Sequence, residues 1–119
     1  MKRTIVSLFV IVLTGTGRLE AHAFLKDAEP GVGSTIQTSP NEIRIRFTEN
    51  IELAFSSIQV FDASGKEVDK RDVHLDRSDR ALLHVSLPQL RAGIYKVVWR
   101  VVSVDTHVTN GSFTFRVSR

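Results

Sequence analysis

Residues 94–102 read IYKVVWRVV, and this stretch decides the fold class. Its side chains alternate as in a β-strand, where successive residues point to opposite faces. One face is expected to enter a hydrophobic core, and it consists of Tyr95, Val97, Trp99 and Val101. The other face carries Lys96 and Arg100 among aliphatic residues. The stretch therefore predicts a long strand with a core on one side.

In residues 101–117 the alternating pattern continues, is interrupted and then resumes in a second predicted strand. The alternation stops near residues 105–107, and the Asn110-Gly111 pair predicts a hairpin turn. A second inward row then follows, made of Phe113, Phe115 and Val117. We interpret Trp99, Tyr95 and the phenylalanines as core residues.

Five shorter runs of strand character precede these two, separated by turn residues. They lie at residues 23–28, 43–47 and 57–61, within 66–79, and at 81–87. No segment shows a helical period. Roughly seven short strands at such spacing predict an all-β protein, an antiparallel Greek-key β-sandwich.

Composition limits the function classes. The 119 residues suffice for one domain, and the absence of cysteine excludes disulfides and thiolate metal sites. The net charge of +3 is small, and outside the N-terminal segment basic and acidic residues nearly balance. Basic residues occur singly among acids, so we expect no nucleic-acid binding.

Residues 1–21 are interpreted as a secretory signal peptide. Lys2 and Arg3 precede an apolar run at residues 5–13, which is too short to span a bilayer. The protein is therefore expected outside the cytosol, with its domain at residues 22–119.

The sequence is compatible with two cleavage sites, and only one of them keeps His22 in the exported protein. Ala21-His22-Ala23 fits the small-x-small rule and would discard His22. Cleavage after Leu19-Glu20-Ala21 fits the rule less well, because leucine is large, but it leaves His22 as the new N-terminus.

Asp105 and His107 are the strongest chemical signal. In an extended backbone, residues two apart share a face, so these side chains could form part of a metal site, a proton relay or a simple ion pair. If His22 is N-terminal, its amine and imidazole can chelate the same cation. Three nitrogens and one carboxylate oxygen suit tetragonal Cu(II). After export the chain holds no sulfur, which excludes a soft Cu(I) site.

The chain resembles CopC-type periplasmic copper-binding proteins over essentially its whole exported length. The matching motifs are His22-Ala23 with Leu25, Glu29-Pro30 with Gly33-Ser34, Phe47-Thr48-Glu49, AGIYKVVW at 92–99, VSVDTH at 102–107 and Asn110-Gly111. The resemblance implies a seven-stranded, immunoglobulin-like sandwich or barrel. It also implies one Cu(II) ion held by an N-terminal His22, Asp105 and His107. Glu49 matches a glutamate that some relatives add.

The resemblance also bears on cleavage and on oxidation state. It argues for cleavage before His22. The methionine-rich loop that some members use for Cu(I) has no counterpart, since residues 54–74 contain no methionine. A carrier of Cu(II) alone is therefore expected.

The expected function is a monomeric periplasmic Cu(II) carrier or buffer in copper homeostasis or resistance, not an enzyme. The implied partner is a CopD-type inner-membrane copper transport protein. One alternative is a small oxidative copper enzyme with a histidine brace, although a domain of this size leaves little room for a substrate cleft. The other alternative is a metal-free immunoglobulin-like interaction domain. His74 and His84 are expected to be surface residues and not ligands.

Overall fold

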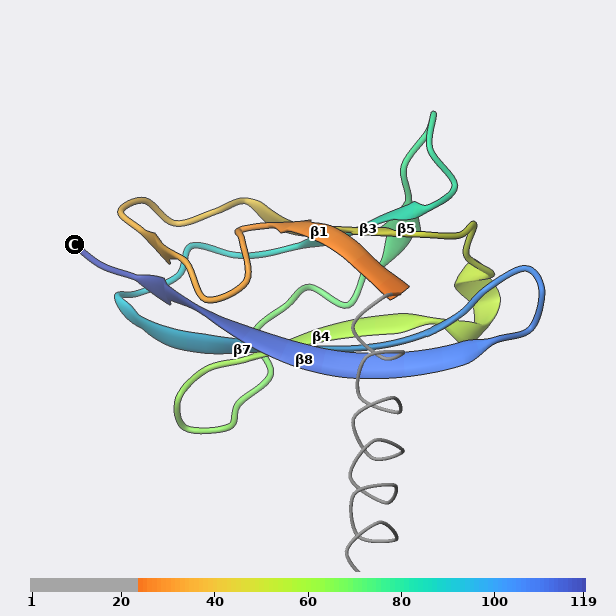
Figure 1. Cartoon of the computed structure of the whole chain (residues 1–119). Helices are drawn as coiled ribbons and strands as arrows, with labels where there is room; N and C mark the ends of the chain where they lie inside the picture. The colour runs from red at the N-terminus through yellow and green to blue at the C-terminus, as the bar shows by residue number, and fades with distance from the viewer. Residues whose placement is uncertain (1–23) are drawn as a thin grey trace, which may run out of the picture.

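The computed structural model describes residues 24–119, which form two β-sheets stacked face to face (Figure 1). The first sheet has the strand order β1 (Leu25–Glu29), β3 (Glu42–Phe47), β6 (Leu82–Ser86), β5 (His74–Leu75). The second has the order β2 (Thr35–Ile36), β8 (Val108–Val117), β7 (Gly93–Val102), β4 (Ser57–Phe61). A short 3₁₀ helix, η1 (Leu53–Phe55), precedes β4. The all-β prediction is confirmed.

The core lies between the sheets and is built from the predicted alternating rows. The inward residues of β7 are all buried, and Trp99 is 3% exposed. Its indole meets the ring of Phe47 from β3 edge-on, with centroids 5.4 Å apart, which ties the two sheets together. Two of the described phenylalanines are exceptions: Phe55 lies on η1 and is 66% exposed, and Phe61 at the end of β4 is only partly buried.

The β7–β8 hairpin is the longest pairing in the described chain. Its register runs from Gly93 opposite Val117 to Val102 opposite Val108, so the turn lies at residues 103–107. Gly111 pairs with Trp99 inside β8, and the predicted hairpin turn at Asn110-Gly111 is therefore wrong.

The packing of Trp99 explains this glycine. A Cβ atom on Gly111 would lie 2.7 Å from Cζ2 of Trp99, closer than packed atoms approach. Glycine is needed at position 111 because the indole crosses it. In the sequence, a glycine after asparagine looks the same whether it forms a hairpin turn or makes room for a neighbouring side chain.

The described chain has eight strands, where the sequence predicted seven. The additional one is β2, which pairs in parallel with the end of β8 through Thr35 opposite Arg116 and Ile36 opposite Val117. Two residues are too short to show a period, so this strand had no sequence signal. The expectation of purely antiparallel pairing is corrected accordingly.

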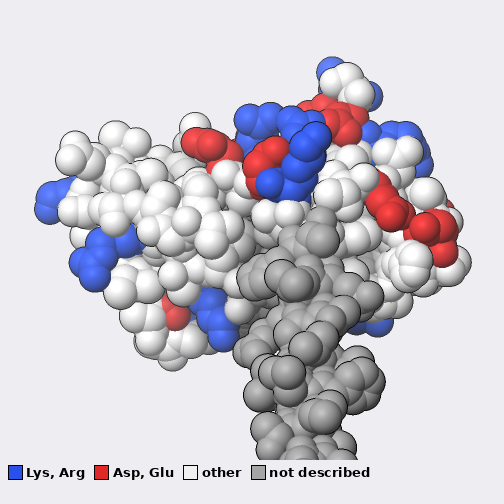
Figure 2. Space-filling model, viewed as in Figure 1, with Lys and Arg blue, Asp and Glu red and all other residues white. Residues whose placement is uncertain are grey.

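The outer face of the first sheet carries charges of both signs, which Figure 2 shows side by side. For example, Arg46 of β3 forms an ion pair with Asp79, and its Nε lies 3.5 Å from Oδ2 of Asp27 on the neighbouring strand β1. No helix among residues 24–119 is long and apolar enough to cross a membrane.

Candidate metal centre

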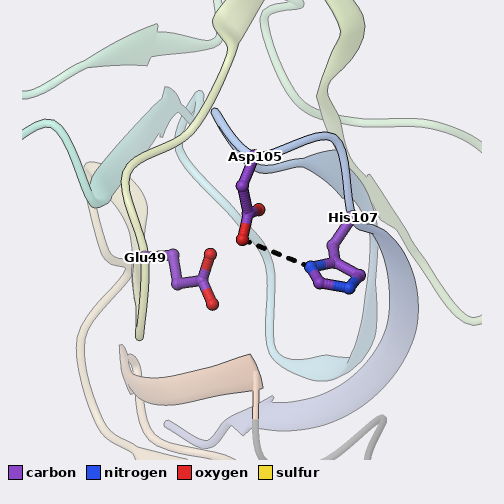
Figure 3. Close-up of side chains that lie close together, drawn as sticks. All are labelled: Glu49, Asp105 and His107. Atoms are coloured by element: carbon purple, nitrogen blue, oxygen red, sulfur yellow. Dashed lines mark ion pairs between the residues drawn. The ribbon is translucent and has the colours of Figure 1, made fainter.

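Asp105 and His107 lie in the turn between β7 and β8. The N–H of Ser103 donates to the carbonyl of His107 at 2.9 Å, and the N–H of Thr106 donates to the carbonyl of Ser103 at 2.8 Å. Thr106 has a left-handed backbone with φ of 72°, which reverses the chain. The two side chains thus meet across a tight turn, not along the extended backbone that was predicted. Oδ2 of Asp105 lies 3.4 Å from Nδ1 of His107 (Figure 3).

Glu49 reaches the same place from the segment that follows β3. An isolated bridge between Ile51 and Ser103 holds this segment beside the turn. As Figure 3 shows, the three side chains converge. One ligand atom from each of Glu49, Asp105 and His107 lies within 4.8 Å of the other two, and all three residues are open to solvent. No other such group of three occurs among the described residues.

Electrostatics favour a cation in this cluster. The hydroxyl of Ser103 is the main cause that lowers the pKa of Asp105. Partial loss of solvation opposes this shift, and contacts with Glu49 and His107 lower the pKa further. Asp105 is therefore ionised at neutral pH, and the carboxyl group of Glu49 lies beside it. The negative charge of Asp105 favours a cation nearby, and imidazole with carboxylate oxygens is a donor set suited to Cu(II).

Ser103 belongs to this site, and the sequence analysis missed it. It is fully buried, and its Oγ contacts Asp105 and accepts the N–H of His107 at 3.2 Å. A signal was available: Ser103 occupies the next inward position after Val101, so a polar residue ends an apolar row.

His22 and the predicted signal peptide at residues 1–21 lie outside the described residues. The first described residue, Phe24, is held at the end of the fold where Glu49, Asp105 and His107 converge. Its carbonyl accepts the N–H of Thr48 at 3.0 Å, and its ring packs on Phe47 with centroids 5.6 Å apart. Thr48 directly precedes Glu49 in the chain.

His84 differs from its prediction. It points away from the core, as expected, yet it is only 9% exposed. Its Nδ1 lies 3.0 Å from Oε1 of Glu42, and its Nε2 lies 2.8 Å from Oδ1 of Asp76. The ring of His74, which is exposed as predicted, stacks on it at 5.2 Å. His84 is covered because Glu42 of the neighbouring strand β3, His74 of the neighbouring strand β5 and Asp76 all lie against its ring.

The fold and site define a class: a small two-sheet β-domain with a carboxylate–imidazole cluster at one end. Residues 25–118 match the CopC domain family, so the chain belongs to the CopC family. Proteins of this family bind and carry copper and are commonly periplasmic. They are not enzymes, which confirms that prediction and sets aside the oxidative-enzyme alternative.

Two relatives illustrate the relationship. The chain is 30% identical to copper resistance protein C of Pseudomonas syringae pv. tomato, over 98% of this chain and 96% of the relative. It is 28% identical to copper transport protein CutJ of Bacillus subtilis, over 97% of this chain. The chain spans only 21% of the length of CutJ.

Solved structures agree with this assignment. CopC from Methylosinus trichosporium OB3b superposes with a TM-score of 0.75 at 34% identity, covering 80% of this chain and 92% of that one. PcoC, a methionine-rich copper resistance protein from Escherichia coli, gives a TM-score of 0.70 at 31% identity, covering 80% and 97%. Membership in the family and the two-sheet architecture are thus established together.

Proposed function

We propose that this protein is a periplasmic carrier or buffer that binds one Cu(II) ion through His22, Asp105 and His107. The observation that carries the proposal is the convergence of Asp105, His107 and Glu49 at the end of the fold where Phe24 enters. Glu49 lies close enough to act as a weak further ligand or as a neighbouring charge.

The position of Phe24 supports a role for His22. An extended chain spans at most about 3.3–3.6 Å per residue, so a residue two positions before Phe24 can reach about 7 Å beyond it. Phe24 is fixed against Thr48, next to Glu49. A chain that begins at His22 would have this length of backbone with which to approach Glu49. This supports our proposal that cleavage follows Ala21 and not Ala23.

The donor atoms favour Cu(II) over Cu(I). An amine, two imidazoles and a carboxylate are nitrogen and oxygen donors, which suit tetragonal Cu(II). The only methionine is Met1 and there is no cysteine, so the exported chain has no sulfur for Cu(I). In this respect it differs from PcoC, which is described as methionine-rich.

The proposed recipient or donor is a CopD-type protein of the inner membrane. CutJ supports this idea, because the part it shares with this chain is about one fifth of a longer copper transport protein. A separate small domain that acts beside a transport protein would do what a covalently joined domain does within one chain. We propose that this chain acts as a monomer.

The deciding experiment is intact-mass analysis of the exported protein, denatured and native, with one equivalent of Cu(II). A denatured mass that begins at His22, with one copper retained in the native spectrum, is expected. A mass that begins at Phe24, or a native spectrum without copper, would refute the proposed site and favour the metal-free interaction domain.

A further inference from the structure

Ser103 is a polar residue in a core-facing row, and every hydrogen bond of its hydroxyl lies within the turn at residues 103–107, here called the metal turn. It is 0% exposed, whereas the two candidate ligands that it touches are exposed. A buried hydroxyl without partners would be destabilising, so its partners define its role.

The partners of the Ser103 hydroxyl can be assigned from its chemistry. A hydroxyl has one hydrogen to donate and two lone pairs. The backbone N–H of His107 donates to Oγ at 3.2 Å, which uses a lone pair. The hydroxyl hydrogen then has two candidate acceptors: Oδ1 of Asp105, in close contact, and the carbonyl of His107 at 3.5 Å. The charged and nearer carboxylate is the stronger acceptor.

This assignment gives the two carboxylate oxygens of Asp105 different partners. Oδ1 is occupied by Ser103, and Oδ2 is the oxygen that lies 3.4 Å from Nδ1 of His107. The carboxylate therefore cannot rotate freely. Through His107 N–H, the same hydroxyl also fixes the backbone of the second ligand.

We propose that Ser103 is a positioning residue that makes Asp105 a one-oxygen ligand, through Oδ2, and holds His107 in register with it. This inference rests on the proposed copper site. A carboxylate that binds through one oxygen leaves a coordination position for a nitrogen donor. Outer-shell partners of metal ligands typically change metal affinity by about 10–100-fold when removed.

Ser56 provides a matched control. Its Oγ donates to the carbonyl of Glu52 at 2.8 Å and accepts the N–H of Val102 at 3.0 Å. It is thus another serine hydroxyl that accepts a backbone N–H at the same end of β7. It has no contact with Asp105 or His107 among its hydrogen bonds.

The test compares Ser103→Ala, Ser103→Thr and Ser56→Ala in the exported protein. Cu(II) affinity is measured by competition with a chelator, and the saturated complexes are compared by electron paramagnetic resonance. We expect Ser103→Ala to weaken binding by about 10–100-fold and to change the spectrum at saturation. Ser103→Thr, which keeps the hydroxyl, should restore the wild-type spectrum, and Ser56→Ala should leave both readouts unchanged.

Two results would overturn the inference while leaving the copper site in place: a wild-type spectrum and affinity for Ser103→Ala, or equal changes in Ser103→Ala and Ser56→Ala. A wild-type protein that holds no Cu(II) would overturn the proposed function and this inference together. Thermal unfolding of the metal-free variants shows whether each one is folded.

Discussion

Asp105 and His107 project from one tight turn, and each offers a metal a different donor atom. Their side chains are exposed, so neither is required for the core. Asp105→Asn and His107→Ala should therefore leave the metal-free fold intact. Each substitution should weaken Cu(II) binding by at least about 10–100-fold, because removing even a residue that only supports a ligand typically has an effect of this size. Calorimetric titration with a competing chelator measures this loss.

The matched control is His74→Ala. His74 is also exposed, but it lies on β5 of the other sheet and stacks on His84. His84 would be a poor control, because its removal leaves Glu42 and Asp76 without a shared partner. If His74→Ala lost as much affinity as His107→Ala, copper would be bound elsewhere.

Asp76 shows how one hydrogen bond makes stability depend on pH. The contact with His84 is the main cause that lowers the pKa of Asp76 to about 2, and contacts with Ser78 add to it. Because the folded-state pKa is below the ordinary value, the stabilisation is fully present above about pH 4 and is lost as the pH falls towards 2.

This reasoning predicts the behaviour of Asp76→Asn. Wild type should be more stable than the variant at about pH 5, and the difference should shrink as the pH falls to about 2. Urea unfolding at several pH values measures it. In a His84→Ala background the pH dependence of the difference should be much weaker. A difference that is independent of pH in the wild-type background would contradict the assignment.

At the scale of elements, the β7–β8 hairpin depends on the pairing of Gly111 with Trp99. Gly111→Ala would place a methyl group 2.7 Å from the indole, so the ring or the strand must shift. Such overpacking typically costs about 1–3 kcal/mol. Chemical denaturation should show a loss of this size in the free energy of unfolding.

Gly31→Ala is the corresponding control. Its added Cβ would lie 3.8 Å from the nearest heavy atom, which is ordinary contact. This variant should change stability by less than about 0.5 kcal/mol, as most surface substitutions do. Equal losses in the two variants would mean that the indole does not impose the glycine.

At the scale of the whole molecule, copper should stabilise the folded chain, because its proposed ligands come from segments far apart in sequence. Cu(II) at about 100 times its dissociation constant should add about 2.7 kcal/mol. In a domain of this size the midpoint of thermal unfolding should rise by roughly 10 °C or more. Differential scanning calorimetry with and without Cu(II) measures the shift.

An added residue ahead of His22 is the control for this shift. It retains every side chain but removes the N-terminal amine from the imidazole of the same residue. The copper-dependent rise should then be mostly lost. An undiminished rise would show that the N-terminal chelate does not contribute.

The sequence by itself determined the fold class and the inward rows, because a period of two is a local property of a half-buried strand. Tyr95, Val97, Trp99 and Val101 are buried as their alternation predicts. It also singled out Asp105 and His107, because the metal turn lies within one short segment. His22, in contrast, remains a prediction.

Only the tertiary structure decided the features that depend on contacts between distant segments. Glu49 joins Asp105 because residue 51 pairs with residue 103. His84 is buried because side chains of the neighbouring strands β3 and β5 and of Asp76 lie against it. Gly111 is required by an indole twelve residues earlier in the chain. Such contacts leave no local period, so alternation and spacing do not reveal them, and Glu49 was predicted only through the family resemblance.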